Sequence, residues 1–148
     1  MTIFYPKKGF KPLIINLKFL TLILIPTFAI LISTRTGLVE WSIFLSFSYG
    51  FVALIYFIVQ QTTLYWIDKD IFYYKSLFLK GSIAIKDIRK IEVDATCWLA
   101  NKPATTHKGG IFIYFAKFDD VFITPDHNDE VVAALLLINP TVEVIYAK

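Results

Sequence analysis

Cysteine, histidine and glycine are scarce in this chain, and their scarcity argues against several kinds of site. The 148 residues include one cysteine, Cys97, two histidines, His107 and His127, and six glycines. A lone cysteine forms no intramolecular disulfide, so we expect the folded part to be cytosolic. Neither Cys-x-x-Cys nor His-Glu-x-x-His spacing occurs. Because the common zinc sites need such spacing, we expect no metal and no cofactor.

Catalytic motifs are missing as well. The chain has no Gly-x-Ser-x-Gly nucleophile motif and no glycine loop that would cradle a phosphate. Neighbouring acids occur at residues 68–70 and 119–120. Both sets lie where β-turns favour short polar side chains, so turn formation explains them better than acid–base catalysis. The sequence therefore predicts no catalytic residues and a protein that is not an enzyme.

Positive charge is concentrated outside the region that is expected to fold in water. The net charge is +3, but residues 1–61 carry +4 and residues 62–148 carry −1. Nucleic-acid binding requires a concentrated basic face on the folded domain. We therefore expect no nucleic-acid partner.

Two long apolar stretches, residues 13–33 and 41–59, dominate the first part of the chain. At ~1.5 Å of rise per residue, each is about long enough to cross a ~30 Å hydrocarbon core as a helix. Because only residues 34–40 separate them, the sequence predicts a transmembrane helical hairpin. Residues 1–61 are thus expected to be a membrane anchor, integral to the lipid bilayer.

The lysines before the first stretch predict the orientation of this hairpin. Lys7, Lys8 and Lys11 should stay on the cytoplasmic side, because positive residues are retained there. A multi-pass protein of the plasma (inner) membrane with both termini in the cytoplasm is expected. Ser46 and Gly50 lie four residues apart, a spacing that lets helices approach closely. We expect this pair to pack within the hairpin, while a homo-oligomer interface remains the alternative.

Residues 62–148 alternate between apolar and polar positions, as in a small water-soluble β domain. A helix is expected to begin at Thr124-Pro125-Asp126, with Thr124 as the N-cap, and to end at Asn139-Pro140. Turns are predicted at 68–70 and 80–81, and a long loop at 100–110. The expected strands are residues 62–67, 71–79, 82–86, 88–96, 111–118, 121–124 and 141–147.

The order of these segments resembles the bacterial pleckstrin-homology (PH-like) domain family, in the branch joined to a short membrane hairpin. The resemblance covers about residues 62–146 and is carried by Tyr65, Asp68, Ile83 to Ile91, Phe122 to Pro125, and Leu136 to Ile145. It implies an α+β fold in which a bent antiparallel β-sheet or barrel is capped by the C-terminal helix. The resemblance implies little about activity. From the membrane anchor and the lack of catalytic motifs, we expect a non-catalytic interaction or scaffold module, for which an unnamed protein partner or a second copy of the chain is possible.

Two other roles stay open. One branch of the family is associated with self-protection against membrane-active bacteriocins, so a membrane-associated immunity or envelope-stress protection factor is the alternative. A subunit of a membrane enzyme or transporter is less favoured, because the apolar stretches lack paired polar groups. Proximity of the gene to a bacteriocin operon would favour the immunity role.

The charge of the first turn and the placement of the aromatic residues both bear on lipid binding. PH domains that bind phosphoinositides carry clustered lysine and arginine around the first β-turn. Here that turn is Asp68-Lys69-Asp70, which is net negative, so we expect no specific phosphoinositide binding. Neighbouring aromatics such as Phe72 and Tyr73 cannot both face one core. Some aromatic surface should therefore meet the membrane, a second copy or a protein partner.

Overall fold

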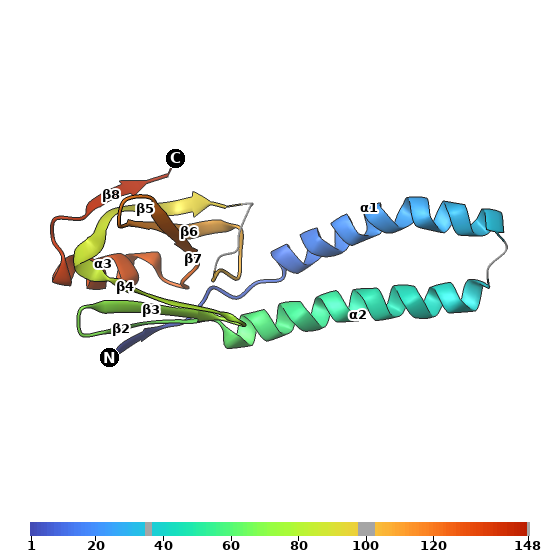
Figure 1. Ribbon diagram of the computed structural model, residues 1–148, viewed down its shortest axis with the longest axis horizontal. Helices are drawn as coiled ribbons and strands as arrows, with labels where there is room; N and C mark the ends of the chain where they lie inside the picture. The colour runs from blue at the N-terminus through green and yellow to red at the C-terminus, as the bar shows by residue number, and fades with distance from the viewer. Residues whose placement is uncertain (35–36, 98–102, 148) are drawn as a thin grey trace. The chain divides into compact units, whose positions relative to one another are not determined.

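Long helices and short strands occupy separate parts of this chain (Figure 1). The computed structural model describes residues 1–34, 37–97 and 103–147, and for residues 26–34 and 38 it describes the backbone alone. The chain forms two compact units. One comprises Phe10–Ile58, and the other combines Met1–Gly9 with Val59–Lys148. We call the second unit the sheet domain.

Two apolar helices account for most of the first unit. They are α1 (Lys11–Thr34) and α2 (Leu38–Thr62). They are joined by a hydrogen bond between the Thr21 and Tyr49 hydroxyls, 2.6 Å apart. Among the residues that the structure describes, one segment, Val39–Thr62, is long and apolar enough to cross a membrane, with a mean hydropathy of 2.1. The predicted stretches lie inside the two helices, and α2 continues three residues beyond its predicted end.

The expectation that Ser46 and Gly50 pack within the hairpin is wrong. Both positions are exposed, and no described atom lies within 4 Å of a Cβ built on Gly50. The reason is helix rotation: the described contact between the helices is made through Tyr49, on another face of α2.

The sheet domain contains two four-stranded sheets and one longer helix. The first sheet has the order β1-β2-β3-β4 and is antiparallel throughout. The second has the order β7-β6-β5-β8, in which β8 runs parallel to β5. The 3-10 helix η1 (Ile85–Asp87) connects the sheets, and α3 follows β7. The bounds are β1 Thr2–Phe4, β2 Leu64–Asp68, β3 Ile71–Ser76, β4 Leu79–Ala84, β5 Ile88–Thr96, β6 Lys108–Phe115, β7 Asp119–Ile123, α3 Asn128–Ile138 and β8 Glu143–Tyr146.

The larger of two apolar clusters joins both sheets and α3, in agreement with the predicted α+β class. Alternate residues of the strands point into it, as the period of two requires. The final helix contributes Val131, Val132 and Leu135 to this core, and all three are buried. The core cluster contains, among others, Tyr65, Phe72, Ile91, Ile113 and Leu135.

The first nine residues belong to the sheet domain, and this corrects the expected division at residue 61. Residues Thr2 to Phe4 pair with β2, with Thr2 opposite Ile67 and Phe4 opposite Tyr65. Phe4 is 7 % exposed and belongs to the core. A three-residue strand is too short to show a reliable alternation, and its partner lies far along the chain.

The turn predicted at residues 80–81 lies earlier, at Leu77 and Phe78. Lys80 and Gly81 are part of β4, and Gly81 is opposite Tyr74. The ring of Tyr74 occupies the space that a Cβ on Gly81 would need. This glycine therefore permits a close approach within the sheet and does not form a turn.

The predicted start of the final helix is also wrong. The helix begins at Asn128, with His127 in the N-cap position and no side-chain hydrogen bond from it. Residues 124–126 instead form an extended segment beside the first residues of the chain, where Lys7 N donates to Thr124 O and Asp126 N donates to Tyr5 O. Of the loop predicted at 100–110, residues 100–102 lie outside the described part and 108–110 belong to β6.

Candidate functional site

The sheet domain has one end at which the chain leaves for the helices and returns from them. The chain leaves after Gly9 and returns at Val59. We call this the junction end. It consists of the segments around Lys7, the last turn of α2, the β3–β4 turn and the described part of the β5–β6 loop, all of which are connected by hydrogen bonds.

A buried polar network centred on Tyr65 holds the junction end together. Tyr65 is fully buried in β2, and its hydroxyl donates to Pro103 O. The same hydroxyl accepts a hydrogen bond from Thr124 N at 3.2 Å. Because a buried polar group is costly unless it is paired, these two bonds fix the loop and the end of β7 against β2.

Thr105 extends this network to the first residues of the chain. Its hydroxyl donates to Lys7 O at 2.6 Å, and its N–H donates to Thr124 Oγ1 at 2.8 Å. Its carbonyl accepts from Gln60 Nε2 at 3.4 Å. Thr105 thereby connects the start of the chain, the end of α2 and the segment after β7, which are far apart in sequence.

The β3–β4 turn lies at the same end, beside the last turn of α2 (Figure 1). Leu77 N donates to Thr62 Oγ1 at 3.1 Å, and the hydroxyls of Thr63 and Ser76 are 2.7 Å apart. Phe78 at the tip of the turn is 91 % exposed. Aromatic surface thus projects from the point where α2 joins the domain.

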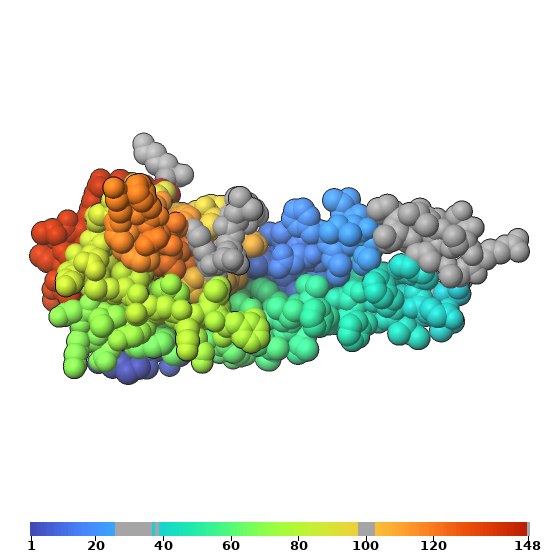
Figure 2. All heavy atoms as spheres, in the orientation of Figure 1, coloured from blue at the N-terminus to red at the C-terminus, as the bar shows by residue number. Residues whose placement is uncertain are grey.

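The opposite end, which we call the distal end, carries the two acidic turns. In the second sheet, Thr96 and Lys108 pair at the junction end, and Ile88 and Phe115 pair at the distal end. The β6–β7 turn, with Phe118 85 % exposed, lies at the distal end, as Figure 2 shows in orange. The Asp68-Lys69-Asp70 turn lies there too, because Asp70 O accepts from Ile85 N just before β5.

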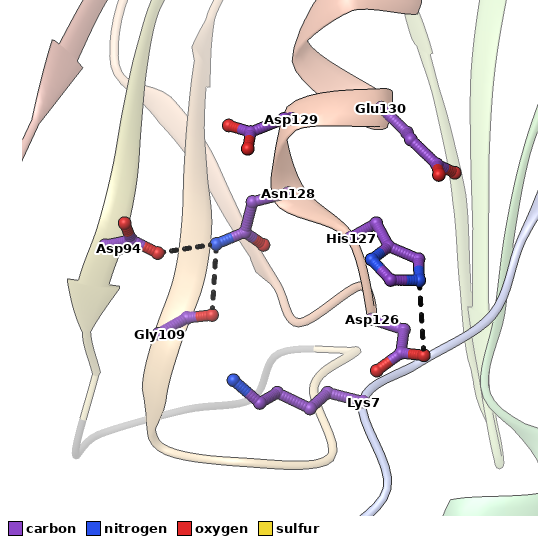
Figure 3. Close-up of a pocket in the computed structure, with 8 residues that line it drawn as sticks. All are labelled: Lys7, Asp94, Gly109, Asp126, His127, Asn128, Asp129 and Glu130. Atoms are coloured by element: carbon purple, nitrogen blue, oxygen red, sulfur yellow. Dashed lines mark hydrogen bonds and ion pairs between the residues drawn. The ribbon is translucent and has the colours of Figure 1, made fainter.

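A polar pocket of about 400 Å³ lies at the start of α3 (Figure 3). Asn128 Nδ2 donates to Asp94 Oδ1 at 2.8 Å and to Gly109 O at 3.2 Å, so it joins the helix to β5 and β6. The pocket is lined by Lys7, Asp94, Gly109, Asp126, His127, Asn128, Asp129 and Glu130. Its carboxylates outnumber its cationic side chains, so the pocket does not suit a phosphate or another anion.

The residues considered for metal binding are not gathered into one site. Cys97 is buried and bonds His107 through the main chain, its N–H donating to His107 O at 2.8 Å. His127 lies at the start of α3, beside Asp126, with 3.8 Å between Nε2 and Oδ2. Within the described ranges, no three histidine, cysteine or acidic side chains are placed to hold a metal ion.

The aromatic residues separate into three groups that the sequence pattern did not distinguish. Phe72 is in the core, while Tyr73 on the outer face of β3 stacks on Trp66, with ring centroids 5.2 Å apart. Phe78 and Phe118 are exposed at turn tips, at opposite ends of the domain. The signal that could have identified Phe78 is an apolar residue in a two-residue turn, where Gly, Asn and Asp are usual.

The Tyr65 hydroxyl predicts a loss of stability at alkaline pH. Burial raises the pKa of Tyr65 to about 12, from an unfolded value of 10.0, while the hydrogen bond from Thr124 opposes this. The neutral phenol is favoured in the folded state, so its stabilisation is complete below pH 10 and is lost as the pH rises through 12. The free energy of unfolding should fall by about 2–3 kcal/mol over this interval. The free energy of unfolding should be measured from pH 9 to 12. It should fall as the pH rises, and Tyr65→Phe should make this fall smaller.

A family model described as "Bacterial PH domain" matches residues 63–139, more than half of the chain. The matched region extends from the start of β2 through α3, so β1, both long helices and β8 lie outside it. Comparisons with curated proteins and with solved structures gave no significant match. PH-like domains are generally non-catalytic interaction modules. The chain therefore belongs to the bacterial PH domain family.

Proposed function

We propose that this protein is a membrane-anchored, non-catalytic interaction module of the bacterial PH type. In this proposal α1 and α2 cross the plasma membrane as a hairpin, and the PH domain lies at the cytoplasmic face. There it serves as a scaffold for a protein partner. The role is supported by family membership, and the anchor by the apolar segment Val39–Thr62.

The pairing of β1 with β2 is the observation that carries the proposal. β1 precedes the two helices in the chain and β2 follows them, yet they are neighbours in one antiparallel sheet. A folded sheet cannot have one strand on each side of a bilayer. The chain must therefore return to the side from which it left, which requires an even number of crossings. If α2 spans the membrane, a second crossing is needed, and α1, with 24 residues, is long enough to supply it.

The cytoplasmic orientation is supported by charge. Lys7, Lys8 and Lys11 immediately precede or begin α1, and such residues are retained on the cytoplasmic side. Cys97 is the single cysteine of the sequence and so has no partner for an intramolecular disulfide, which suits a reducing compartment.

The partner is expected to be a protein and not a phosphoinositide. The acidic turn Asp68-Lys69-Asp70 lies at the distal end of β2, away from the point where α2 joins the domain. Two carboxylates there oppose the approach of a phosphate. Apolar side chains suited to protein contact are exposed at the end of α3 and on the edge strand β8, where Leu137 is 86 % and Tyr146 is 59 % exposed.

Labelling of intact cells tests the topology. In a Cys97→Ala background, Glu40→Cys near the start of α2 should react with a membrane-impermeant maleimide from outside, whereas Phe118→Cys should react only after permeabilisation. Both side chains are exposed in the structure, so a difference in labelling between them would report the side of the membrane and not local burial. Labelling of Phe118→Cys in intact cells would place the domain outside and refute the proposal. Equal protection of both cysteines would contradict the hairpin.

Crosslinking of the full-length protein in its native membrane tests the scaffold role. We expect a specific protein partner to be recovered with the wild type and to be reduced by Leu137→Ser or Tyr146→Ser. Phe118→Ser, a change of equal kind at another exposed site, is the control. Recovery of the chain alone would refute the scaffold role.

A further inference from the structure

The β3–β4 turn is bonded directly to the residue at which the proposed membrane span ends. The apolar segment ends at Thr62, and Thr62 Oγ1 accepts the hydrogen bond from Leu77 N at 3.1 Å. The neighbouring Thr63 and Ser76 hydroxyls are 2.7 Å apart. The turn is therefore held beside the last turn of α2, at the end of the sheet domain that is nearest the membrane in the proposed topology.

The residues of this turn are unusual for a hairpin that faces water. Ser76 and Leu79 form the closing pair, so Leu77 and Phe78 are the two central residues. Leu77 has a φ of 49°, in the left-handed region that hairpin turns normally fill with glycine or asparagine. Phe78 is 91 % exposed and Leu79 is 41 % exposed. Backbone strain of this kind is concentrated at functional sites.

Two lysines flank the apolar tip. Lys75 and Lys80 are directly opposite each other in the β3–β4 register, and both are exposed. Like charges directly opposite on neighbouring strands are destabilising. Bound anionic groups would remove this repulsion, and the inner leaflet of a membrane presents them.

We propose that the β3–β4 turn is a second, interfacial membrane contact of this protein. Phe78 and Leu79 enter the boundary between headgroups and acyl chains, and Lys75 and Lys80 bind anionic headgroups. The contact orients the PH domain on the bilayer, because it adds a second point of attachment beside the end of α2. This inference rests on the proposed function, since it takes Val39–Thr62 as a membrane span.

Phe118 is the matched comparison for Phe78. It is also at a turn tip, is 85 % exposed and has a lysine beside it, with Lys117 Nζ 5.3 Å from the ring centroid. It differs in position, since it lies at the distal end of the domain. If membrane contact depends on position in the domain and not on exposure alone, residue 78 should contact lipid and residue 118 should not.

The test uses the full-length chain in vesicles of phosphatidylcholine and phosphatidylglycerol. In a Cys97→Ala background, single cysteines replace Phe78, Phe118 or Phe51, and each is labelled with bimane. Phe51 lies within α2 and is 52 % exposed in the protein alone, so it reports the span itself. Quenching by lipids that carry a doxyl group near the headgroup, and by aqueous iodide, is then measured.

We expect doxyl quenching at residue 78 to exceed that at residue 118 several-fold, with the reverse order for iodide. Equal iodide quenching at 78 and 118, with residue 51 protected from iodide, would overturn the interfacial contact and leave the span intact. Iodide quenching of residue 51 would instead refute the proposed span. Substituting both Lys75→Glu and Lys80→Glu should lower doxyl quenching at residue 78 several-fold, and Lys117→Glu should not. An unchanged signal in the double variant would overturn the role of anionic headgroups.

Discussion

Removal of residues 1–8 should strongly destabilise the PH domain, although these residues lie outside the matched family region. The test uses a variant in which a long glycine–serine linker replaces residues 10–58. Extra linker length is acceptable, because the entropic cost of closing a loop rises only slowly with its length. Loss of the buried Phe4 side chain alone should cost about 3–5 kcal/mol. This is a large part of the ~5–15 kcal/mol by which small domains are stable. Urea unfolding of the linked variant, with and without residues 1–8, measures the difference.

Two point substitutions within β1 provide the control for this prediction. Phe4 is 7 % exposed, whereas Ile3, on the other face of the strand, is 43 % exposed. Phe4→Ala should therefore lower the urea midpoint far more than Ile3→Ala. Equal and small effects would mean that β1 is not part of the stable domain. In that case, the fold would no longer require an even number of membrane crossings.

Thr124→Val should destabilise the domain by about 1–3 kcal/mol, because it leaves a buried N–H without its partner. Thr124 is fully buried, and its Oγ1 accepts from Thr105 N at 2.8 Å and lies 3.0 Å from Thr105 Oγ1. Valine keeps the shape of threonine, so the loss reports the hydrogen bonds and not a cavity. Thr141→Val is the control, since the Thr141 hydroxyl bonds Asn139 Oδ1 at an exposed site and should matter much less.

Urea unfolding also checks the start of α3 at Asn128. His127 is the N-cap residue and makes no side-chain capping bond. His127→Ser should therefore stabilise the helix, by about 0.5–1 kcal/mol, through a new bond to a free N–H in the first turn. If the helix began at Thr124, serine at position 127 would lie inside the helix and bring no gain.

A double-mutant cycle of Thr105→Val and Thr124→Val should also show a coupling of at least about 0.5 kcal/mol.

Much of the architecture was predictable from patterns that are local in sequence. Mean hydropathy and length located the two helices, since a run of some twenty apolar residues has few soluble alternatives. Alternation located most strands between Leu64 and Ile123, because the side-chain period of two is visible wherever one face is buried. Asn139 and Pro140 correctly indicated the end of α3. The order of these segments was sufficient to suggest the PH-like family.

The mispredicted elements depend on packing and hydrogen bonds between residues that are not neighbours in sequence, most of them far apart along the chain. β1 forms because Phe4 fills a core position opposite Tyr65, and Thr124 leaves its expected cap because Thr105 and Lys7 bind that segment. Gly81 stays in a strand because the ring of Tyr74 needs its space, which moves the turn to Leu77 and Phe78. Hydropathy, period and turn residues are properties of neighbours in sequence, so the chain by itself determined its class, its helices and most of its strands. Only the tertiary structure decided which segments close the sheet and which turn lies beside the end of α2, because those choices are made by packing and by buried hydrogen bonds between distant residues.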